Sequence, residues 1–346
     1  MKRTLLRVLA LALLAGCERP QTEAAPAPVL RTAINTSQLQ VTTSQLLTKP
    51  PQPKRATAPL ATPLRVRTVR QFAWGEGPTQ LGHVLGGEQN PEAPMALDID
   101  ALGRVVILDQ VNQRLLLTSR DGSVTQLPAP RTAQDLLVTG EHVWLLDRLV
   151  DKQLQRIDLT SGAVLQTLKL QGIEEPGAIS ALWAQHDDLY TEVGHVTMQR
   201  LASLQGLPRA PKAVAGRLSP DGSLVLTAAR HLPDRVTVVV RKAADAPDAV
   251  PLRSLEAVLP LPVAQIVELA TDAMGRIWLV ADLGDDKVQR RQVLMWPVDS
   301  NDAVRGELAA WHGPEEAFRP ARIAPNGHLF ALGLSSDGMT LQEVAP

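Results

Sequence analysis

The chain has little of the residue types on which several functions depend. Only 3% of its 346 residues are aromatic, one is a cysteine, and 35 basic residues balance 36 acidic ones. Without an excess of basic residues there is no global attraction for nucleic acid. Scarce aromatics also weaken any platform for stacking bases or sugars. These shortages exclude nucleic acid from the expected partners.

Signatures of common catalytic sites are missing as well. The seven histidines form no His-x-His or His-x-x-x-His pair, so a zinc site has no support. There is no Gly-x-Ser-x-Gly elbow for a serine nucleophile and no phosphate-binding loop ending in Lys-Ser or Lys-Thr. Enzymatic activity is uncertain from the sequence, and a non-enzymatic role is favoured.

The amino terminus has the layout of an export signal. Three basic residues precede the apolar run Val8–Leu14, and two small residues then precede Cys17. The run is too short to span a bilayer. The tetrapeptide Leu14-Ala15-Gly16-Cys17 resembles the lipobox of bacterial lipoproteins.

This resemblance implies a lipid anchor. Residues 1–16 would be a signal peptide, and Cys17 would carry diacylglycerol on its thiol and an acyl chain such as palmitate on its amino group. Two or three chains on one residue anchor a protein, whereas one chain holds it only marginally. In lipoproteins a residue other than Asp after the cysteine usually implies the outer membrane, and Glu18 fits. We expect a protein anchored to the membrane of the cell envelope, facing the periplasm or the cell surface. An ordinary signal peptide or a buried core cysteine is the alternative.

Residues 17–63 have the composition of a disordered linker. Prolines recur among Ala, Thr, Gln and Ser, and such a mixture cannot bury enough apolar surface to order itself. Over about 47 residues a flexible chain reaches roughly 40 Å on average. The stretch 29–47 is richer in apolar residues. It is either a docking segment for a partner or for the domain itself, or a spacer, and the spacer is the favoured interpretation.

The remaining residues, 64–346, contain a sixfold repeat. A turn rich in Gly, Asp or Asn is followed each time by a short apolar run, and such residues suit tight hairpins. The distances between the runs are typical of four-stranded propeller blades. The runs are Val105–Asp109, Val143–Asp147, Leu189–Glu192, Leu224–Thr227, Ile277–Val280 and Leu329–Leu332.

The first repeat carries further residues in a regular order, namely Pro94, Asp98, Gly103, Asp109, Asn112, Arg114, Asp121 and Gly122. This order resembles the NHL-type propeller repeat. There, a proline enters the inner strand, an Asp ends the second strand, Asn-x-Arg opens the third, and an Asp-Gly turn follows. The other five repeats keep only the turn and the strand. The resemblance implies an all-β fold, a six-bladed β-propeller over residues 64–346.

The way the ring closes follows from counting strands. The sixth repeat ends with a third strand, Met339–Val344, and leaves an outer edge unpaired, which is a liability. Residues 64–70 alternate apolar and basic side chains, as a half-buried strand does. We therefore predict that residues 64–70 supply the missing outer strand beside Met339–Val344.

Four aromatic residues occupy the same position of the repeat, where Val106 and Val225 also occur. They form either a ring of ligand-stacking groups or a layer that packs between neighbouring blades. Packing is favoured because the position also accepts valine. The four are Trp144, Tyr190, Trp278 and Phe330.

Acidic residues offer two candidate cation sites. Asp98 and Asp100 lie on one side of a strand, and with Asp109 and Asn112 they could hold a cation at the mouth of the propeller. Turn capping and an ion pair between Asp109 and Arg114 form the favoured alternative. The second candidate is the acidic loop with Asp282, Asp285 and Asp286, either a weak Ca²⁺ site or, as favoured, a solvated turn. No cofactor is expected beyond such a structural Ca²⁺.

A further comparison concerns Glu76-Gly77-Pro78. In gluconolactonase-like propellers a Glu-x-Pro opens the domain and its carboxylate binds the catalytic metal. Here several residues intervene before Pro94, which makes Glu76 a weak candidate for a metal ligand. Four arginines could recognise an anionic partner, although ordinary surface charge is favoured; they are Arg290, Arg291, Arg319 and Arg322.

The leading hypothesis is a lipid-anchored propeller that binds a protein, peptide or glycan of the envelope without catalysis. The alternative is a metal-dependent lactonase or related hydrolase of the gluconolactonase type, and a third is a structural protein without a ligand. Convergence of three or more carboxylate, Asn or His side chains in the central channel would favour the hydrolase. The residues that decide this are Asp98, Asp100, Asp135, Glu268 and Asp272.

Overall fold

The computed structural model describes residues 63–88, 90–246, 248–285 and 289–346. The predicted signal peptide, the predicted lipidation site Cys17 and the apolar stretch 29–47 lie outside the described residues, as does nearly all of the linker. No helix in the described ranges is long and apolar enough to cross a membrane.

The predicted apolar runs form the second strands of six antiparallel four-stranded sheets. The first blade contains β2 (Ala96–Ile99), β3 (Val105–Asp109), β4 (Arg114–Thr118) and β5 (Val124–Pro128). The second contains β6 (Asp135–Thr139), β7 (His142–Asp147), β8 (Gln153–Asp158) and β9 (Val164–Lys169). The third contains β10 (Ile179–Gln185), β11 (Asp188–Val193), β12 (Thr197–Ser203) and β13 (Ala213–Ala215), preceded by the 3₁₀ turn Pro176–Ala178.

The other three blades follow the same order. The fourth contains β14 (Arg217–Leu218), β15 (Leu224–Leu232), β16 (Arg235–Lys242) and β17 (Arg253–Val258). The fifth contains β18 (Val263–Thr271), β19 (Ile277–Gly284), β20 (Gln289–Trp296) and β21 (Val304–Leu308). The sixth contains β22 (Ala321–Ile323), β23 (Leu329–Ser335), β24 (Gly338–Ala345) and β1 (Arg65–Ala73).

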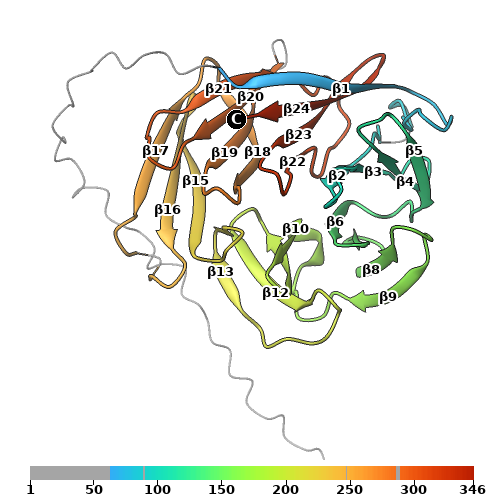
Figure 1. The fold of residues 1–346 in the computed structure, drawn as a ribbon, viewed down its shortest axis with the longest axis horizontal. Coiled ribbons are helices and arrows are strands. Elements are labelled where there is room, and N and C mark those ends of the chain that lie inside the picture. The colour runs from blue at the N-terminus through green and yellow to red at the C-terminus, as the bar shows by residue number, and fades with distance from the viewer. Residues whose placement is uncertain (1–62, 89, 247, 286–288) are drawn as a thin grey trace, which may run out of the picture. The chain divides into compact units, whose positions relative to one another are not determined.

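The sheets are arranged as the blades of a ring, with the first strand of each blade innermost (Figure 1). The prediction of an all-β, six-bladed propeller is therefore confirmed. In an antiparallel blade, the loop that enters the first strand and the loop between the second and third strands lie at the same end. We call that end of the ring the mouth face.

The ring is closed by the first strand of the domain. β1 pairs antiparallel with β24, from Arg65 opposite Ala345 to Ala73 opposite Gly338, with one irregularity between Thr68 and Arg70. The predicted outer strand is confirmed. Gly338 has a φ of 151°, and a Cβ there would overlap the carbonyl oxygen of Phe72. The pairing of β24 with β1 therefore needs glycine at this position.

The repeated aromatic position is part of the core, as predicted. Trp144 of the second blade packs with Leu182 and Leu189 of the third, in a cluster that excludes solvent. Trp278 of the fifth blade packs in the same way against Leu329 of the sixth. These side chains fill the space between blades and do not face a ligand.

Candidate functional site

The central channel is lined by charged side chains from neighbouring blades. Asp98 lies on β2, Asp135 on β6 and Glu268 on β18, so three of the five acidic candidates lie along it, without forming a group that could hold a metal ion within the described residues. The same channel also contains three arginines and a fourth carboxylate, Glu192 of β11. The arginines are Arg217, Arg319 and Arg322.

Each channel carboxylate is paired with an arginine. Asp98 lies 3.1 Å from Arg322, and Asp135 lies 3.0 Å from Arg319. Arg217 serves two carboxylates, with nitrogen–oxygen distances of 2.7 Å to Glu192 and 3.2 Å to Glu268. We call this set of seven residues the channel network.

The channel network also joins blades through the backbone. The carboxylate of Asp98 accepts a hydrogen bond from the N–H of Val138, on the inner strand of the next blade, at 2.8 Å. The carboxylate of Asp135 accepts one from the N–H of Leu182 in the following blade at 2.7 Å. Arg217 donates to the carbonyl of Leu269 at 3.0 Å. These contacts hold adjacent inner strands together.

Trp183 of β10 occupies the middle of the arginines. The guanidinium carbons of Arg322, Arg319 and Arg217 lie 4.6, 4.9 and 5.4 Å from the centroid of its rings. Cations at such distances are attracted by the face of an indole. Trp183 therefore fixes the arginines in place and fills space that a metal or ligand would need.

Burial affects the protonation of the channel acids. Desolvation raises the pKa of Asp135, against the opposing effect of Arg319. It also raises the pKa of Glu268, against Arg217. The charged forms are thus held in the channel at a cost that the arginines offset only in part.

The raised pKa of Glu268 gives a pH dependence that can be measured. The native state binds the proton of Glu268 more tightly than the unfolded chain does. Glu268 therefore contributes stability that is complete below about pH 4. This contribution is lost as the pH rises through the pKa of Glu268 in the folded state. In Glu268→Gln the free energy of unfolding should fall less between pH 4 and pH 8 than in the parent. Urea titrations at several pH values measure the difference, and identical slopes would contradict it.

The interpretation of Arg290, Arg291, Arg319 and Arg322 as surface charge is wrong for three of the four. Arg319 is 2% exposed and Arg322 is 9% exposed, both inside the channel. Arg291 is fully buried and forms two bonds of 2.6 and 2.8 Å with Asp282. Arg290 alone of the four has the predicted exposed position, 4.0 Å from Glu307.

The candidate metal ligands of the first blade are not brought together. Asp98 belongs to the channel network, whereas Asp100 sits in the turn after β2 and bonds to Arg104 at 2.5 Å. Glu76 lines a separate surface depression beside Asn112 and Arg114. Within the described residues no three His, Cys, Asp or Glu side chains are grouped so that they could hold a metal ion.

The remaining acidic candidates have local roles. Asp109 accepts hydrogen bonds from Arg114 at 2.8 Å and Asn112 at 2.9 Å, the ion pair that the sequence favoured. The carboxylate of Asp272 accepts a hydrogen bond from Arg276 in the same turn and another, at 2.9 Å, from the indole N–H of Trp278. In the acidic loop Asp282 forms an ion pair with Arg291, and Asp286 lies outside the described residues.

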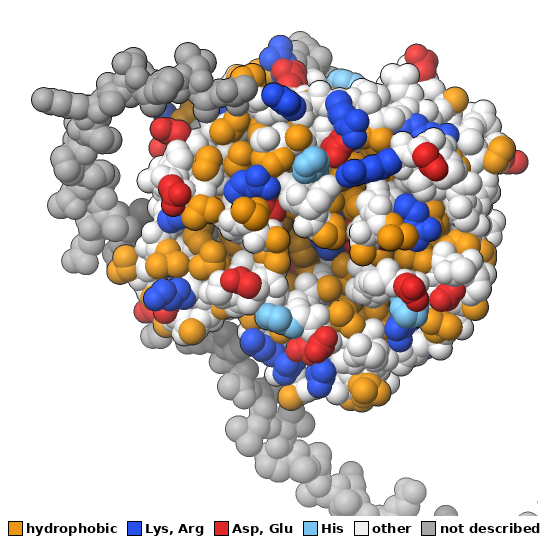
Figure 2. All heavy atoms as spheres, in the orientation of Figure 1, with side chains coloured by type: hydrophobic (Ala, Val, Ile, Leu, Met, Phe, Trp, Pro, Cys, Tyr) orange, Lys and Arg blue, Asp and Glu red, His pale blue; other side chains and the backbone are white. Residues whose placement is uncertain are grey.

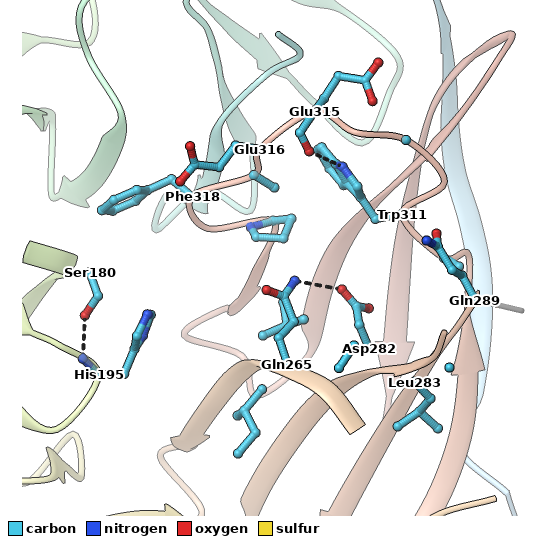
Figure 3. Close-up of a pocket in the computed structure, with 18 of the residues that line it drawn as sticks. Ser180, His195, Gln265, Asp282, Leu283, Gln289, Trp311, Glu315, Glu316 and Phe318 are labelled. Atoms are coloured by element: carbon cyan, nitrogen blue, oxygen red, sulfur yellow. Dashed lines mark hydrogen bonds between the residues drawn. The ribbon is translucent and has the colours of Figure 1, made fainter. Parts of the chain in front are cut away.

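A cavity of about 620 Å³ opens at the mouth face. It is formed by the loops of the second, third, fifth and sixth blades and by the start of β18 (Figure 3). Such a volume is typical of a ligand site. The side chains that face the space include Trp311, Phe318, Gln265, His195 and Glu316. We call it the mouth cavity.

His195 stands at the rim of the mouth cavity in a strained conformation. Its φ is 60°, in the left-handed region that few residues other than glycine adopt, and its N–H donates to the Ser180 hydroxyl at 3.1 Å. Desolvation lowers the pKa of its imidazole, against the opposing effect of Glu192, so the ring is uncharged at neutral pH. The side chain can therefore donate or accept one hydrogen bond without a charge.

Outside the cavity the surface is mixed in character. Figure 2 shows basic, acidic and apolar side chains interspersed around a central hollow, with no continuous area of one charge. The face in view therefore offers no basic track for a nucleic-acid backbone.

Comparisons with known proteins found similarity of fold alone. No family model matches the chain, and no curated protein matches it. Among solved structures, a chain of the mitotic checkpoint complex is 12% identical with a TM-score of 0.49, covering 86% of this chain and 97% of that one. The calcium-binding protein regucalcin from Agrobacterium tumefaciens is 15% identical with a TM-score of 0.45, covering 80% and 95%.

Streptogramin B lyase is also similar, at 9% identity with a TM-score of 0.44, covering 82% of this chain and 98% of that one. At such low identities these similarities carry no argument about a site or an activity. The number of blades is given by the strand pairing itself.

Proposed function

We propose that this protein is a lipid-anchored lipoprotein of the bacterial envelope whose NHL-type propeller binds a partner at the mouth cavity without catalysis. The anchor is supported by the tetrapeptide Leu14-Ala15-Gly16-Cys17 and by Glu18 after it. The NHL type is supported by the first blade, in which Asn112 and Arg114 bond to Asp109.

One observation carries the non-catalytic role. The carboxylates along the channel are each paired with Arg217, Arg319 or Arg322. A metal could use them only by displacing buried arginines, which would leave positive charges without partners at a large cost. The mouth cavity, in contrast, is open and has the size of a binding site.

A photo-crosslinking residue at the rim tests this proposal. Glu316 lines the mouth cavity with a side chain that is 74% exposed. Val250, which is 88% exposed in the loop between β16 and β17, is a control on the opposite face. A p-benzoylphenylalanine at position 316 should yield a discrete crosslinked product in intact envelopes, and one at position 250 should not.

Metal analysis of the purified protein separates this proposal from the hydrolase alternative. We expect Ca²⁺ and Zn²⁺ below one ion per chain and no lactone hydrolysis that chelation abolishes. A stoichiometric ion together with chelator-sensitive hydrolysis would overturn the non-catalytic role. Equal crosslinking from positions 316 and 250 would overturn the assignment of the mouth cavity.

Replacement of Cys17 tests the anchor. Cys17→Ser removes the thiol that would carry the lipid, so the protein should move from the membrane fraction to the soluble fraction, with its fold unchanged. Glu18→Asp is the matched variant: it keeps the lipid and should shift the protein from the outer to the inner membrane. Cys17→Ser protein that still sediments with membranes at high salt would contradict lipid anchoring.

A further inference from the structure

We infer that the mouth cavity receives an extended, uncharged polypeptide segment, which adds as a strand to the free edge of β18. This inference rests on the proposed binding function of the mouth cavity and names the chemistry of its partner. Three observations support it: the exposed backbone edge of one inner strand, the charges of the cavity wall, and the contacts already made by polar and aromatic side chains of the cavity.

β18 is the longest inner strand. It has nine residues, whereas β14 has two, β22 three, β2 four, β6 five and β10 seven. One edge of β18 pairs with β19, and the other edge faces the channel. The first part of the strand reaches the mouth cavity, where residues 264–267 form a wall.

That part of β18 is accessible. Ala264 and Gln265 are exposed, and Ile266 and Val267 are half-buried. Apart from the ladder with β19, no hydrogen bond to the backbone of residues 264–267 is found within the described ranges. An exposed strand edge with unpaired N–H and C=O groups is a template for another strand.

The pairing with β19 is irregular along the same stretch. Its register shifts between Val263 and Gln265 and again between Ile266 and Glu268. Such bulges bend a strand and redirect its side chains, and they occur often beside functional sites. They set the first part of β18 apart from the regular lower part, which packs in the core.

Several charged side chains of the cavity wall have a partner of opposite charge. Asp282 lies 2.6 Å from Arg291, and Arg290 lies 4.0 Å from Glu307. Arg148 lies 3.9 Å from Glu316. A charged ligand would gain little here and would lose its hydration, so uncharged side chains are favoured.

Three of the side chains that could recognise a sugar already have partners. The Gln265 amide donates to Asp282 at 2.9 Å, and the Trp311 indole donates to the carbonyl of Glu315 at 2.8 Å. The ring of Phe318 is covered by the guanidinium of Arg148 at 4.7 Å. The backbone edge of β18 is not engaged in this way, which favours a peptide over a glycan.

The dimensions are consistent with a short strand. Four residues of β18 extend about 13 Å at the usual rise of a strand. The half-buried apolar side chains of Ile266, Trp311 and Ala317 lie among the lining residues. They can receive an apolar side chain of the added strand, because alternate side chains of a strand point to one side.

The first experiment selects a probe. A phage library of random octapeptides is panned against the full-length Cys17→Ser protein. We expect enriched peptides that are uncharged and free of proline over at least four consecutive residues. Ala264→Glu, which places a charge on the exposed edge, should weaken the dissociation constant of the best peptide at least tenfold. The matched variant Val250→Glu, on the opposite face, should leave it unchanged.

The second experiment tests strand addition itself. Two versions of the best peptide are N-methylated at alternate residues, odd in one and even in the other. Only one set of N–H groups can face β18, so one version should lose binding at least tenfold and the other should retain it. Equal binding by both versions, or equal effects of Ala264→Glu and Val250→Glu, would overturn the inference.

Failure of the inference can be told from failure of the proposed function. If no peptide is enriched while a crosslinker at position 316 captures a glycan or a folded surface, strand addition at β18 is wrong and binding at the mouth cavity stands. If position 316 also captures nothing beyond the control at position 250, both are wrong.

Discussion

Replacing Arg217 with leucine should lower the free energy of unfolding by about 4 kcal/mol, as expected when one partner is removed from a buried ion pair. Arg217 is buried, and it is the partner of Glu192 and Glu268. Its removal leaves two carboxylates in the channel without a counter-charge. It also removes the bond to the carbonyl of Leu269, which joins the fourth and fifth blades.

Two further variants show whether uncompensated charge is the cause. Adding Glu192→Gln and Glu268→Gln to Arg217→Leu should recover a large part of the loss, because neutral amides are easier to bury than carboxylates. Arg235→Leu removes an exposed pair with Glu256 and should cost less than about 1 kcal/mol. Denaturant titrations measure all three. A loss from Arg217→Leu no larger than that from Arg235→Leu would contradict the structural role of the channel network.

Phe72→Ala should destabilise the domain by about 4 kcal/mol, the usual cost of emptying a phenylalanine site in a core. Phe72 is 1% exposed and lies in a cluster with Phe330, Met339 and Leu341 of the sixth blade. It is the buried side chain of β1, and Val66 and Val69 are partly buried on the same strand. Its loss weakens the closing strand and exposes the edge of β24.

The neighbouring residue provides the control. Gln71 is on the same strand with an exposed side chain, and Gln71→Ala should change stability by less than about 0.5 kcal/mol. Thermal unfolding followed by circular dichroism measures both, and hydrogen exchange at residues 65–73 should rise in Phe72→Ala alone. Equal stabilities would mean that β1 contributes no packing to the ring.

The second strands could be predicted from the sequence because most of them are buried on both sides, β15 being the exception. β3 and β23 contain no polar residue before their last position, and each follows a turn with glycine. The inner strands do not have this signal. β14 has two residues and β22 has three, too short for any periodicity. The closing strand was predictable because the alternation from Leu64 to Arg70 is local.

The channel network could be predicted only in part. Asp98, Asp135 and Glu268 were singled out as acids near inner strands, but their partners were not. Arg319 and Arg322 lie 184 and 224 residues from Asp135 and Asp98, so no local pattern relates them. Arginine is usually exposed, and the surface interpretation followed that rule.

Trp183, Glu192 and Arg217 could not be predicted as channel residues for a different reason. Trp183 is on a first strand and is outside the repeated aromatic position, and Glu192 is the last residue of the run Leu189–Glu192, whose pattern indicates only a buried strand. A signal existed in the acidic residue at the end of that apolar run. The mouth cavity could not be predicted, because loops from four blades form it.

The closure of the ring has a consequence for the timing of folding. Arg67 and Glu343, which are paired across β1 and β24, are 276 residues apart. At synthesis rates of about 5 to 20 residues per second, β1 waits roughly 15 to 55 s for its partner. Meanwhile the growing row of blades exposes an unpaired edge at its end. The yield of the folded domain therefore depends on how long the unfinished chain is kept from pairing with others. Chaperones that act in that interval should influence yield and leave the stability of the folded protein unchanged.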